Sequence, residues 1–306
     1  MQENGAPIEG DFDPPSEVLE PRELTSPLVF SSPHSGRVYP ARFLAAARLD
    51  AAALRRSEDA YVDELFASAG EVGAPLLRAH FPRAYLDLNR EPYELDPKLF
   101  EGRLPEFANT RSLRVAAGLG TIPRVVADAR EIYAGRIPID EALRRIEALY
   151  KPYHAMLRGL MERAQERFGV AILVDCHSMP SSSAREPSLA GRGDKRRLDF
   201  VIGDRYGASA APGLVEGVEE RLRARGHQIQ RNRPYAGGFI TEHFGRPAAG
   251  WHAIQIEVSR GLYMDEATLE KGPRFAAIAA DLAEVAAGLA QDSDRIFGGP
   301  RRMAAE

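Results

Sequence analysis

The chain alternates short apolar runs with longer segments whose apolar positions repeat at helical spacing. The short runs predict buried strands, because they are bounded by turn-forming residues and are too short for helices. We expect strands at residues 27–32, 75–80, 83–90, 171–175, 198–202, 227–231 and 253–258. Since predicted strands and helices alternate, the pattern indicates an α/β fold, a mixed and mostly parallel sheet flanked by helices.

Helical periodicity is clearest over residues 138–168, where Ile146, Leu149, Tyr153 and Leu157 belong to one apolar stripe. Gly169 follows directly and is a typical helix terminator. Further helices are expected over residues 45–70, with Asp50 or Ser57 as cap, and over residues 212–225 and 265–289. Residues 91–125 and the Gly-rich residues 236–250 lack a period, and we interpret them as loops that serve a site.

One core domain is the simplest organisation of 306 residues, because no linker or repeat interrupts the middle of the chain. We predict a flexible N-terminal arm over residues 1–24, the core domain over residues 25–292 and a C-terminal tail over residues 293–306. The arm is rich in Pro, Glu and Gly, a composition that disfavours packing.

Charge and cysteine content narrow the class of partner. A net charge of −4 gives no basic field for nucleic acid or anionic lipid, and no apolar run is long enough to span a membrane. Cys176 is the single cysteine, so an internal disulfide is excluded and a cytoplasmic location is expected. The expected partner is a small molecule, and the oligomeric state cannot be inferred.

Two histidines share one context, since His34 and His177 each follow an apolar run and precede a serine. Ligands gather at the carboxyl ends of strands in open α/β sheets, and two imidazoles there can meet at one metal ion. A hydrolytic zinc site needs about three protein ligands, and Glu58 or Asp59 can supply a carboxylate. Each histidine alone is equally compatible with a structural role. The two acids are equally compatible with a position in the first turn of a helix, where the helix dipole favours negative charge.

Glu257 lies inside the apolar run 253–258, where a carboxylate is costly to bury without a partner. It is either ion-paired, with Arg260 as the nearest candidate, or a general base. Cys176 is expected to be a small buried residue and not a nucleophile.

Arg83, Asn89 and Arg90 form a group of polar donors in an otherwise extended segment. Guanidinium groups suit a substrate carboxylate or a developing oxyanion, although surface solvation explains any single arginine equally well. Thr241 lies in the Gly-rich loop, which either lines a substrate pocket or forms a tight turn.

The chain resembles the zinc carboxypeptidase-like hydrolases, and within them the N-formylglutamate amidohydrolase family. The resemblance rests on ordered segments, VFSSPHSGRVYP, SEDAYVDELF, YLDLNREPYELDP, VDCHSMPS, DFVIGDRYG and NRPYAGGFITEHFGRP leading into HAIQIEVSRGLYMDE. Together they span about residues 28–266. The resemblance therefore implies a zinc carboxypeptidase-like fold for nearly the whole core.

The resemblance also implies the metal site. Its ligands would be His34, His177 and an acid of the pair Glu58 and Asp59, with Asp59 favoured, around Zn²⁺ or another divalent transition metal. One departure concerns the first histidine: zinc carboxypeptidases use His-x-x-Glu, whereas Arg37 stands three residues after His34. The acid must therefore come from further along the chain.

The remaining implied roles concern substrate and catalysis. Arg83 would polarise the scissile carbonyl and Glu257 would be the catalytic base. The implied or suggested substrate-binding residues are Asn89, Arg90, Arg260 and Thr241. The implied reaction is metal-dependent hydrolysis of an N-acyl amino acid, with N-formyl-L-glutamate giving formate and L-glutamate.

Two alternatives stay open at this point. One is a zinc amidase or carboxypeptidase-like enzyme that acts on another N-acyl amino acid or a peptide, since the acyl group depends on pocket shape. The other is a metal-free binding protein on the same fold. Metal content and a panel of N-acyl substrates distinguish them.

Overall fold

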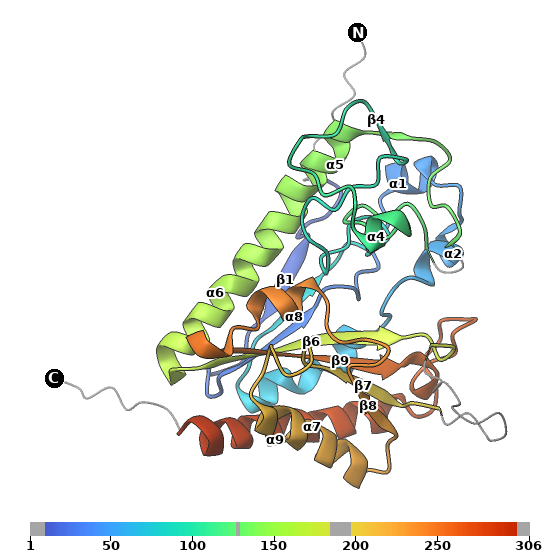
Figure 1. Cartoon of the computed structure of the whole chain (residues 1–306). Coiled ribbons are helices and arrows are strands. Elements are labelled where there is room, and N and C mark those ends of the chain that lie inside the picture. The colour runs from blue at the N-terminus through green and yellow to red at the C-terminus, as the bar shows by residue number, and fades with distance from the viewer. Residues whose placement is uncertain (1–9, 127–128, 184–196, 299–306) are drawn as a thin grey trace. The chain divides into compact units, whose positions relative to one another are not determined.

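The computed structural model describes residues 10–126, 129–183 and 197–298 (Figure 1). The N-terminal half contains β1 (Ser16–Leu19), β2 (Leu28–Ser32), α1 (Ala41–Ala46), α2 (Ala51–Arg55), α3 (Val62–Leu65), η2 (Ala67–Val72), β3 (Leu76–Ala79), β4 (Phe100–Glu101), α4 (Leu113–Ala116), β5 (Ile137–Pro138), α5 (Ile139–Arg145) and the π-helical η4 (Ile146–Tyr150). The C-terminal half contains α6 (Lys151–Phe168), β6 (Ala171–Met179), β7 (Phe200–Gly203), α7 (Pro212–Ala224), β8 (Ile229–Arg231), α8 (Phe239–Phe244), η5 (Pro247–Ala249), β9 (Trp251–Ser259), η6 (Arg260–Leu262) and α9 (Phe275–Phe297).

Seven of the described strands form one sheet in the order β1-β3-β2-β6-β9-β7-β8. The pairs β2–β6, β6–β9 and β7–β8 are parallel, and β7 runs antiparallel to β9. The predicted mixed, mostly parallel α/β fold is therefore confirmed.

The central strands β2, β6 and β9 are buried along their whole length. Both faces of these strands are covered, and the sequences supply apolar residues for both, Ala171–Val174 in β6 and Ala253, Ile254, Ile256 and Val258 in β9. In Figure 1, α7 and α9 lie on one side of these strands and α8 lies on the other. No helix in the described part of the chain combines the length and apolar character needed to cross a membrane.

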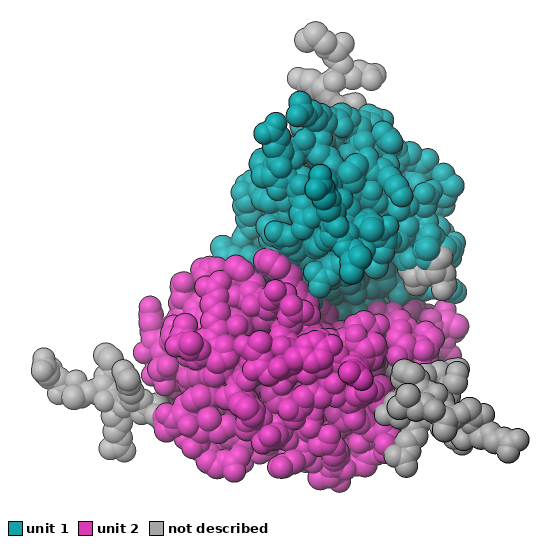
Figure 2. Space-filling model, viewed as in Figure 1, with its two compact units in different colours: residues 1–17, 33–60, 78–156 teal, residues 18–32, 61–77, 157–306 magenta. Residues whose placement is uncertain are grey.

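The chain divides into two compact units, which Figure 2 colours separately. Unit 1 comprises residues 1–17, 33–60 and 78–156, and unit 2 comprises residues 18–32, 61–77 and 157–306. The chain passes between them several times, so neither unit is a continuous stretch of sequence. The division into arm, core domain and tail stays a prediction.

The long helix predicted over residues 138–168 is present as α5, η4 and α6 in direct succession. Gly169 has a positive φ of 80° and ends it as expected. The π-helical stretch in its middle was not anticipated from the apolar stripe.

The single helix predicted over residues 45–70 is wrong. The structure has short helices there, and Tyr61 interrupts them with a left-handed φ of 64°. Asp50 does cap α2, since its side chain accepts a hydrogen bond from the Ala53 N–H. Ser57 instead donates its hydroxyl to the Leu54 carbonyl.

Three further predictions also need correction. Residues 83–90 form no strand, and residues 236–250 contain α8 where a loop was expected. The last helix, α9, begins at Phe275 and not at residue 265, and it continues into the predicted tail as far as Phe297. The predicted N-terminal arm contains β1, while residues 1–9 and 299–306 lie outside the described residues.

Candidate active site

In unit 1, His34 lies just after the buried strand β2, and its ring faces two carboxylates. Nδ1 lies 3.4 Å from Asp59 Oδ2, and Nε2 lies 2.7 Å from Asp87 Oδ1. The Asp59 N–H also donates to the His34 carbonyl at 3.0 Å, which fixes the two residues beside each other. All three side chains are buried. Because an ionised carboxylate only accepts, the short contact with Asp87 requires a proton on Nε2, and Nδ1 is the ring nitrogen that faces Asp59.

Asp87 is the centre of a polar group in unit 1. Besides His34, its carboxylate accepts from Arg83 Nη2 at 2.9 Å and from the Asn89 N–H at 2.9 Å, and it lies 3.5 Å from Arg90 Nη2. Burial raises the pKa of the Asp87 carboxyl, but the positive charges of Arg90 and Arg83 and the hydrogen bond from His34 outweigh it and hold the pKa well below its usual range. Asp87 is therefore an ionised carboxylate.

Glu58 is turned to different partners from those of its neighbour Asp59. Its carboxylate accepts from the Tyr39 hydroxyl at 2.7 Å and from Arg55 Nε at 3.2 Å. Burial raises the pKa of Glu58, against the lowering effects of Tyr39 and Arg55. Of the two acids left open by the sequence, Asp59 is the one beside His34.

The predicted arginines of unit 1 are anchored by protein groups. Arg83 Nη1 lies 3.8 Å from Asp59 Oδ1, in addition to its bond with Asp87. Arg90 donates from Nε to the Leu119 carbonyl and from Nη1 to the Asn89 carbonyl. Burial is the largest effect on the Arg90 pKa and lowers it. Both guanidinium groups are thus fixed in orientation before any ligand binds.

In unit 2, His177 lies near the carboxyl end of β6, as the sequence predicted. Its Nε2 lies 3.0 Å from Asp175 Oδ1, and the Thr241 hydroxyl donates to the other oxygen of Asp175 at 3.1 Å. Asp175 and Thr241 are fully buried. Thr241, suggested as a substrate-binding residue, is therefore in contact with the aspartate that holds the His177 ring.

Glu257 lies on β9 directly beside His177 of β6, since the two are partners in the parallel register. Gln255 Nε2 donates to Glu257 Oε1 at 2.9 Å, and the Gly238 N–H donates to the Gln255 amide oxygen at 2.9 Å. The side-chain amide of Gln255 is thereby oriented with its nitrogen toward the carboxylate. This arrangement gives the Glu257 carboxylate a fixed hydrogen-bond donor on the neighbouring side chain of the same strand.

The other two candidates in this region have structural contacts. Arg260 Nε donates to Ser178 Oγ at 3.1 Å. Cys176 is fully buried between Asp175 and His177 in sequence, and burial raises the pKa of its thiol well above the usual range. The expectation that Cys176 is not a nucleophile agrees with these properties.

Among the described residues, His34, Asp59 and His177 make up the group that could hold a metal ion, with one ligand atom from each. Two imidazole nitrogens and one carboxylate oxygen are a donor set suited to zinc. In each histidine the second ring nitrogen is bonded to an aspartate, which is the usual arrangement around metal-bound histidine.

The fold and these buried histidines and carboxylates define an α/β enzyme of the hydrolytic type. A family model described as N-formylglutamate amidohydrolase matches residues 26–264, and the chain belongs to this family. It is accordingly an amidohydrolase.

Curated relatives and a solved structure agree with this assignment. The chain is 32% identical over 254 residues to N-formylglutamate deformylase of Pseudomonas aeruginosa, covering 82% of this chain and 86% of the relative. It is 31% identical over 255 residues to the enzyme of the same name from Pseudomonas putida, covering 81% and 86%. The crystal structure of N-formylglutamate amidohydrolase from Ralstonia eutropha JMP134 matches with a TM-score of 0.84 and 38% identity, over 92% of this chain and 99% of that one.

Two residues of the site were missed from the sequence, Asp87 and Asp175. Both interrupt apolar stretches, Leu86-Asp87-Leu88 and Val174-Asp175-Cys176. The argument applied to Glu257, that an acid in an apolar run needs a partner or a function, applies to them equally.

Proposed function

We propose that this chain hydrolyses N-formyl-L-glutamate to formate and L-glutamate in a metal-dependent reaction. The observation that carries the proposal is that the two buried histidines have the same hydrogen-bonding arrangement. Nε2 of each is held by an aspartate, which presents Nδ1 as the ligand atom. The names of the relatives support the choice of substrate.

The proposed metal ligands are His34 Nδ1, Asp59 Oδ2 and His177 Nδ1, and the donor set fits Zn²⁺ or another divalent transition metal. Asp59 is preferred over Glu58 because Glu58 is bonded to Tyr39 and Arg55. An ion held there would supply Lewis-acid activation of the attacking water and of the formyl oxygen.

Glu257 is the proposed general base and acid. Its carboxylate accepts a proton from the attacking water, whose oxygen bonds to the formyl carbon. The same proton then passes to the amide nitrogen as the C–N bond breaks, and the second water proton passes from the new carboxyl group to the amine, so that formate and the ammonium form of L-glutamate leave. The hydrogen bond from Gln255 orients the carboxylate for the first of these transfers.

Arg83 is the proposed donor to the developing oxyanion. Its guanidinium is held by Asp87 and Asp59, so it needs no reorganisation when the charge forms. Asn89 and Arg90 are the proposed binding residues for a substrate carboxylate, with Arg260 as a further candidate, and their fixed geometry lowers the entropy lost on binding.

Formate release from N-formyl-L-glutamate tests the proposal directly. The purified chain should release formate, lose that activity after treatment with a chelator, and regain it when Zn²⁺, Co²⁺ or Mn²⁺ is added. Full turnover by protein that contains no metal would refute metal dependence.

A substrate panel tests the acyl group and the amino acid. N-formyl-L-glutamate should be hydrolysed faster than its N-acetyl and N-succinyl analogues, since the proposal places a small acyl group at the reacting centre. Preference for another acyl group or for a peptide would contradict the proposed substrate, but the chain would still be an amidohydrolase. Binding without any hydrolysis would favour a binding protein.

A further inference from the structure

The substrate-binding segment of unit 1, residues 85–90, is neither helix nor strand. Its backbone carbonyls therefore have no ladder of partners, and those that are buried or partly buried need donors from elsewhere. Three of them receive it from side chains of one helix, the continuous α5, η4 and α6.

The three donors are an arginine, a tyrosine and a histidine of that helix. Arg145 Nη1 donates to the Tyr85 carbonyl at 3.0 Å, and the Tyr150 hydroxyl donates to the Arg90 carbonyl at 2.7 Å. His154 Nε2 donates to the Leu88 carbonyl at 2.9 Å, since a carbonyl only accepts. We call Arg145, Tyr150 and His154 the helix clamp.

The helix clamp is rigid in its own right. The Arg145 guanidinium lies 3.7 Å from the centre of the Tyr85 ring and also donates to the Tyr133 hydroxyl at 2.7 Å. The rings of Tyr150 and His154 stack with their centres 4.2 Å apart. Arg145 is therefore supported by Tyr133 outside the segment as well as by the Tyr85 ring within it, and Tyr150 and His154 support each other.

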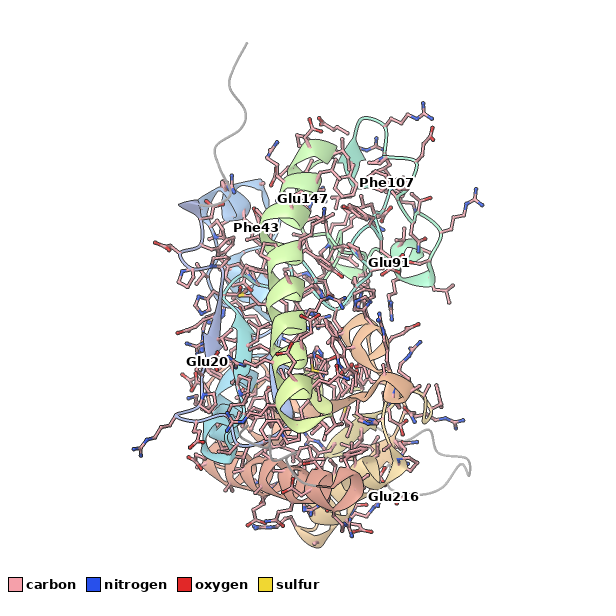
Figure 3. All side chains as sticks on the ribbon, turned by 90° about the vertical axis from the view of Figure 1, so that its left-hand side faces the viewer. Glu20, Phe43, Glu91, Phe107, Glu147 and Glu216 are labelled. Atoms are coloured by element: carbon pink, nitrogen blue, oxygen red, sulfur yellow. The ribbon has the colours of Figure 1, made fainter. Side chains whose placement is uncertain are left out.

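The π-helical stretch η4 explains how these side chains line up. In an α-helix, side chains four apart lie on the same face, as Tyr150 and His154 do. Arg145 and Tyr150 are five apart, which matches the i to i+5 repeat of a π-turn. Because η4 spans Ile146–Tyr150, it adds the one residue that brings Arg145 onto the face of the other two. Figure 3 views this helix, with Glu147 labelled in η4 and Glu91 labelled just after the bound segment.

We propose that the helix clamp positions the segment that carries Asn89 and Arg90, the residues proposed to bind the substrate carboxylate. The π-helical stretch η4 aligns the three side chains of the clamp. The proposal rests on the proposed function for the role of Asn89 and Arg90. Arg145, Tyr150 and His154 are positioning residues, because they hold the backbone and the substrate is held by others.

Two kinds of variant test the helix clamp. Tyr150→Phe and His154→Leu each remove one donor, whereas His154→Gln keeps an N–H donor at a similar reach. Tyr206→Phe, at an exposed tyrosine, and Arg144→Gln, at an exposed residue of the same helix, are matched controls.

For Tyr150→Phe and His154→Leu we expect KM for N-formyl-L-glutamate to rise about tenfold, the size of one lost hydrogen bond, with kcat changed less than about threefold. Binding of L-glutamate, measured by calorimetry, should weaken by the same factor, and zinc content should not change. His154→Gln and both controls should behave like the wild type. Unchanged KM in Tyr150→Phe and His154→Leu, or equal loss of kcat and metal in every variant, would overturn the proposal.

Hydrogen exchange separates this proposal from the proposed function. Peptides covering residues 83–92 should exchange faster in Tyr150→Phe than in the wild type, while peptides covering β6 should not change. This result is expected whichever substrate the enzyme uses. If exchange over residues 83–92 is unaltered, the helix clamp is refuted even in an active enzyme. If the wild type fails to hydrolyse N-formyl-L-glutamate while exchange responds, only the proposed function and the carboxylate role fail.

Discussion

The two histidines of the candidate site are held in the same way by two different kinds of structure. In unit 2, Asp175 and His177 are on one strand, and Glu257 is beside His177 on the next, so strand register alone sets their spacing. In unit 1, His34 is oriented by Asp87, which lies 53 residues later in an irregular segment. In unit 2 the backbone of two paired strands positions the side chains. In unit 1 the side chains are positioned by hydrogen bonds between residues far apart in the sequence.

This comparison predicts that both halves are needed for metal. His34→Ala and His177→Ala should each reduce bound zinc to a small fraction of the wild-type amount, because each removes one of three proposed protein ligands. Metal analysis of the purified variants measures this. His80→Ala, at a histidine outside the proposed ligand set, is the matched control. Full zinc occupancy in either ligand variant would remove that histidine from the site.

Catalysis should depend most sharply on the strand-borne half. Glu257→Gln keeps the shape of the side chain but removes the base, so kcat should fall by about 10²–10⁴-fold while zinc stays bound. Steady-state kinetics of formate release give the value. Glu270→Gln, the same change at an exposed glutamate, should leave kcat unaltered. Near-normal kcat in Glu257→Gln would exclude Glu257 as the base.

Asp87→Asn and Asp175→Asn compare the two aspartates directly. Both should weaken zinc binding about 10–100-fold, since each orients a proposed ligand. Asp87→Asn should in addition lower the free energy of unfolding by about 3 kcal/mol, because Arg90 is largely buried and loses its charge partner. Urea denaturation measures the difference in the free energy of unfolding. Equal stability of the two variants would contradict the claim that side-chain bonds to Asp87 hold the unit 1 residues while strand register holds those of unit 2.

Thr241→Val should have the smallest effect. It removes one hydrogen bond to Asp175, which corresponds to about 1 kcal/mol of stability. KM should not change if Thr241 positions Asp175. A large rise in KM with unchanged stability would instead support the substrate-binding role suggested by the sequence.

The sequence predicted the strand-borne half well, for a physical reason. The mainly apolar segments 171–174 and 253–258 are short and rich in β-branched and other apolar residues, which favours buried strands. His177 and Glu257 could therefore be placed on strands before the structure was known. Their positions beside each other depend on register, which a single sequence does not reveal.

The unit 1 half was harder to predict, because its conformation is set by distant groups. Residues 83–90 alternate like a strand, yet their backbone is bound by Arg145, Tyr150 and His154 of a helix far along the chain. Similarly, a left-handed Tyr61 breaks the helix predicted over residues 45–70. Neither feature has a local signal in the apolar pattern.

The central claim is that His34, Asp59 and His177 share one metal ion. Anomalous diffraction at the zinc absorption edge, from crystals of the full chain grown with Zn²⁺, tests it most directly. We predict one strong peak within coordination distance of His34 Nδ1, an oxygen of Asp59 and His177 Nδ1. A peak elsewhere, or ligation by only one of these residues, would contradict the account.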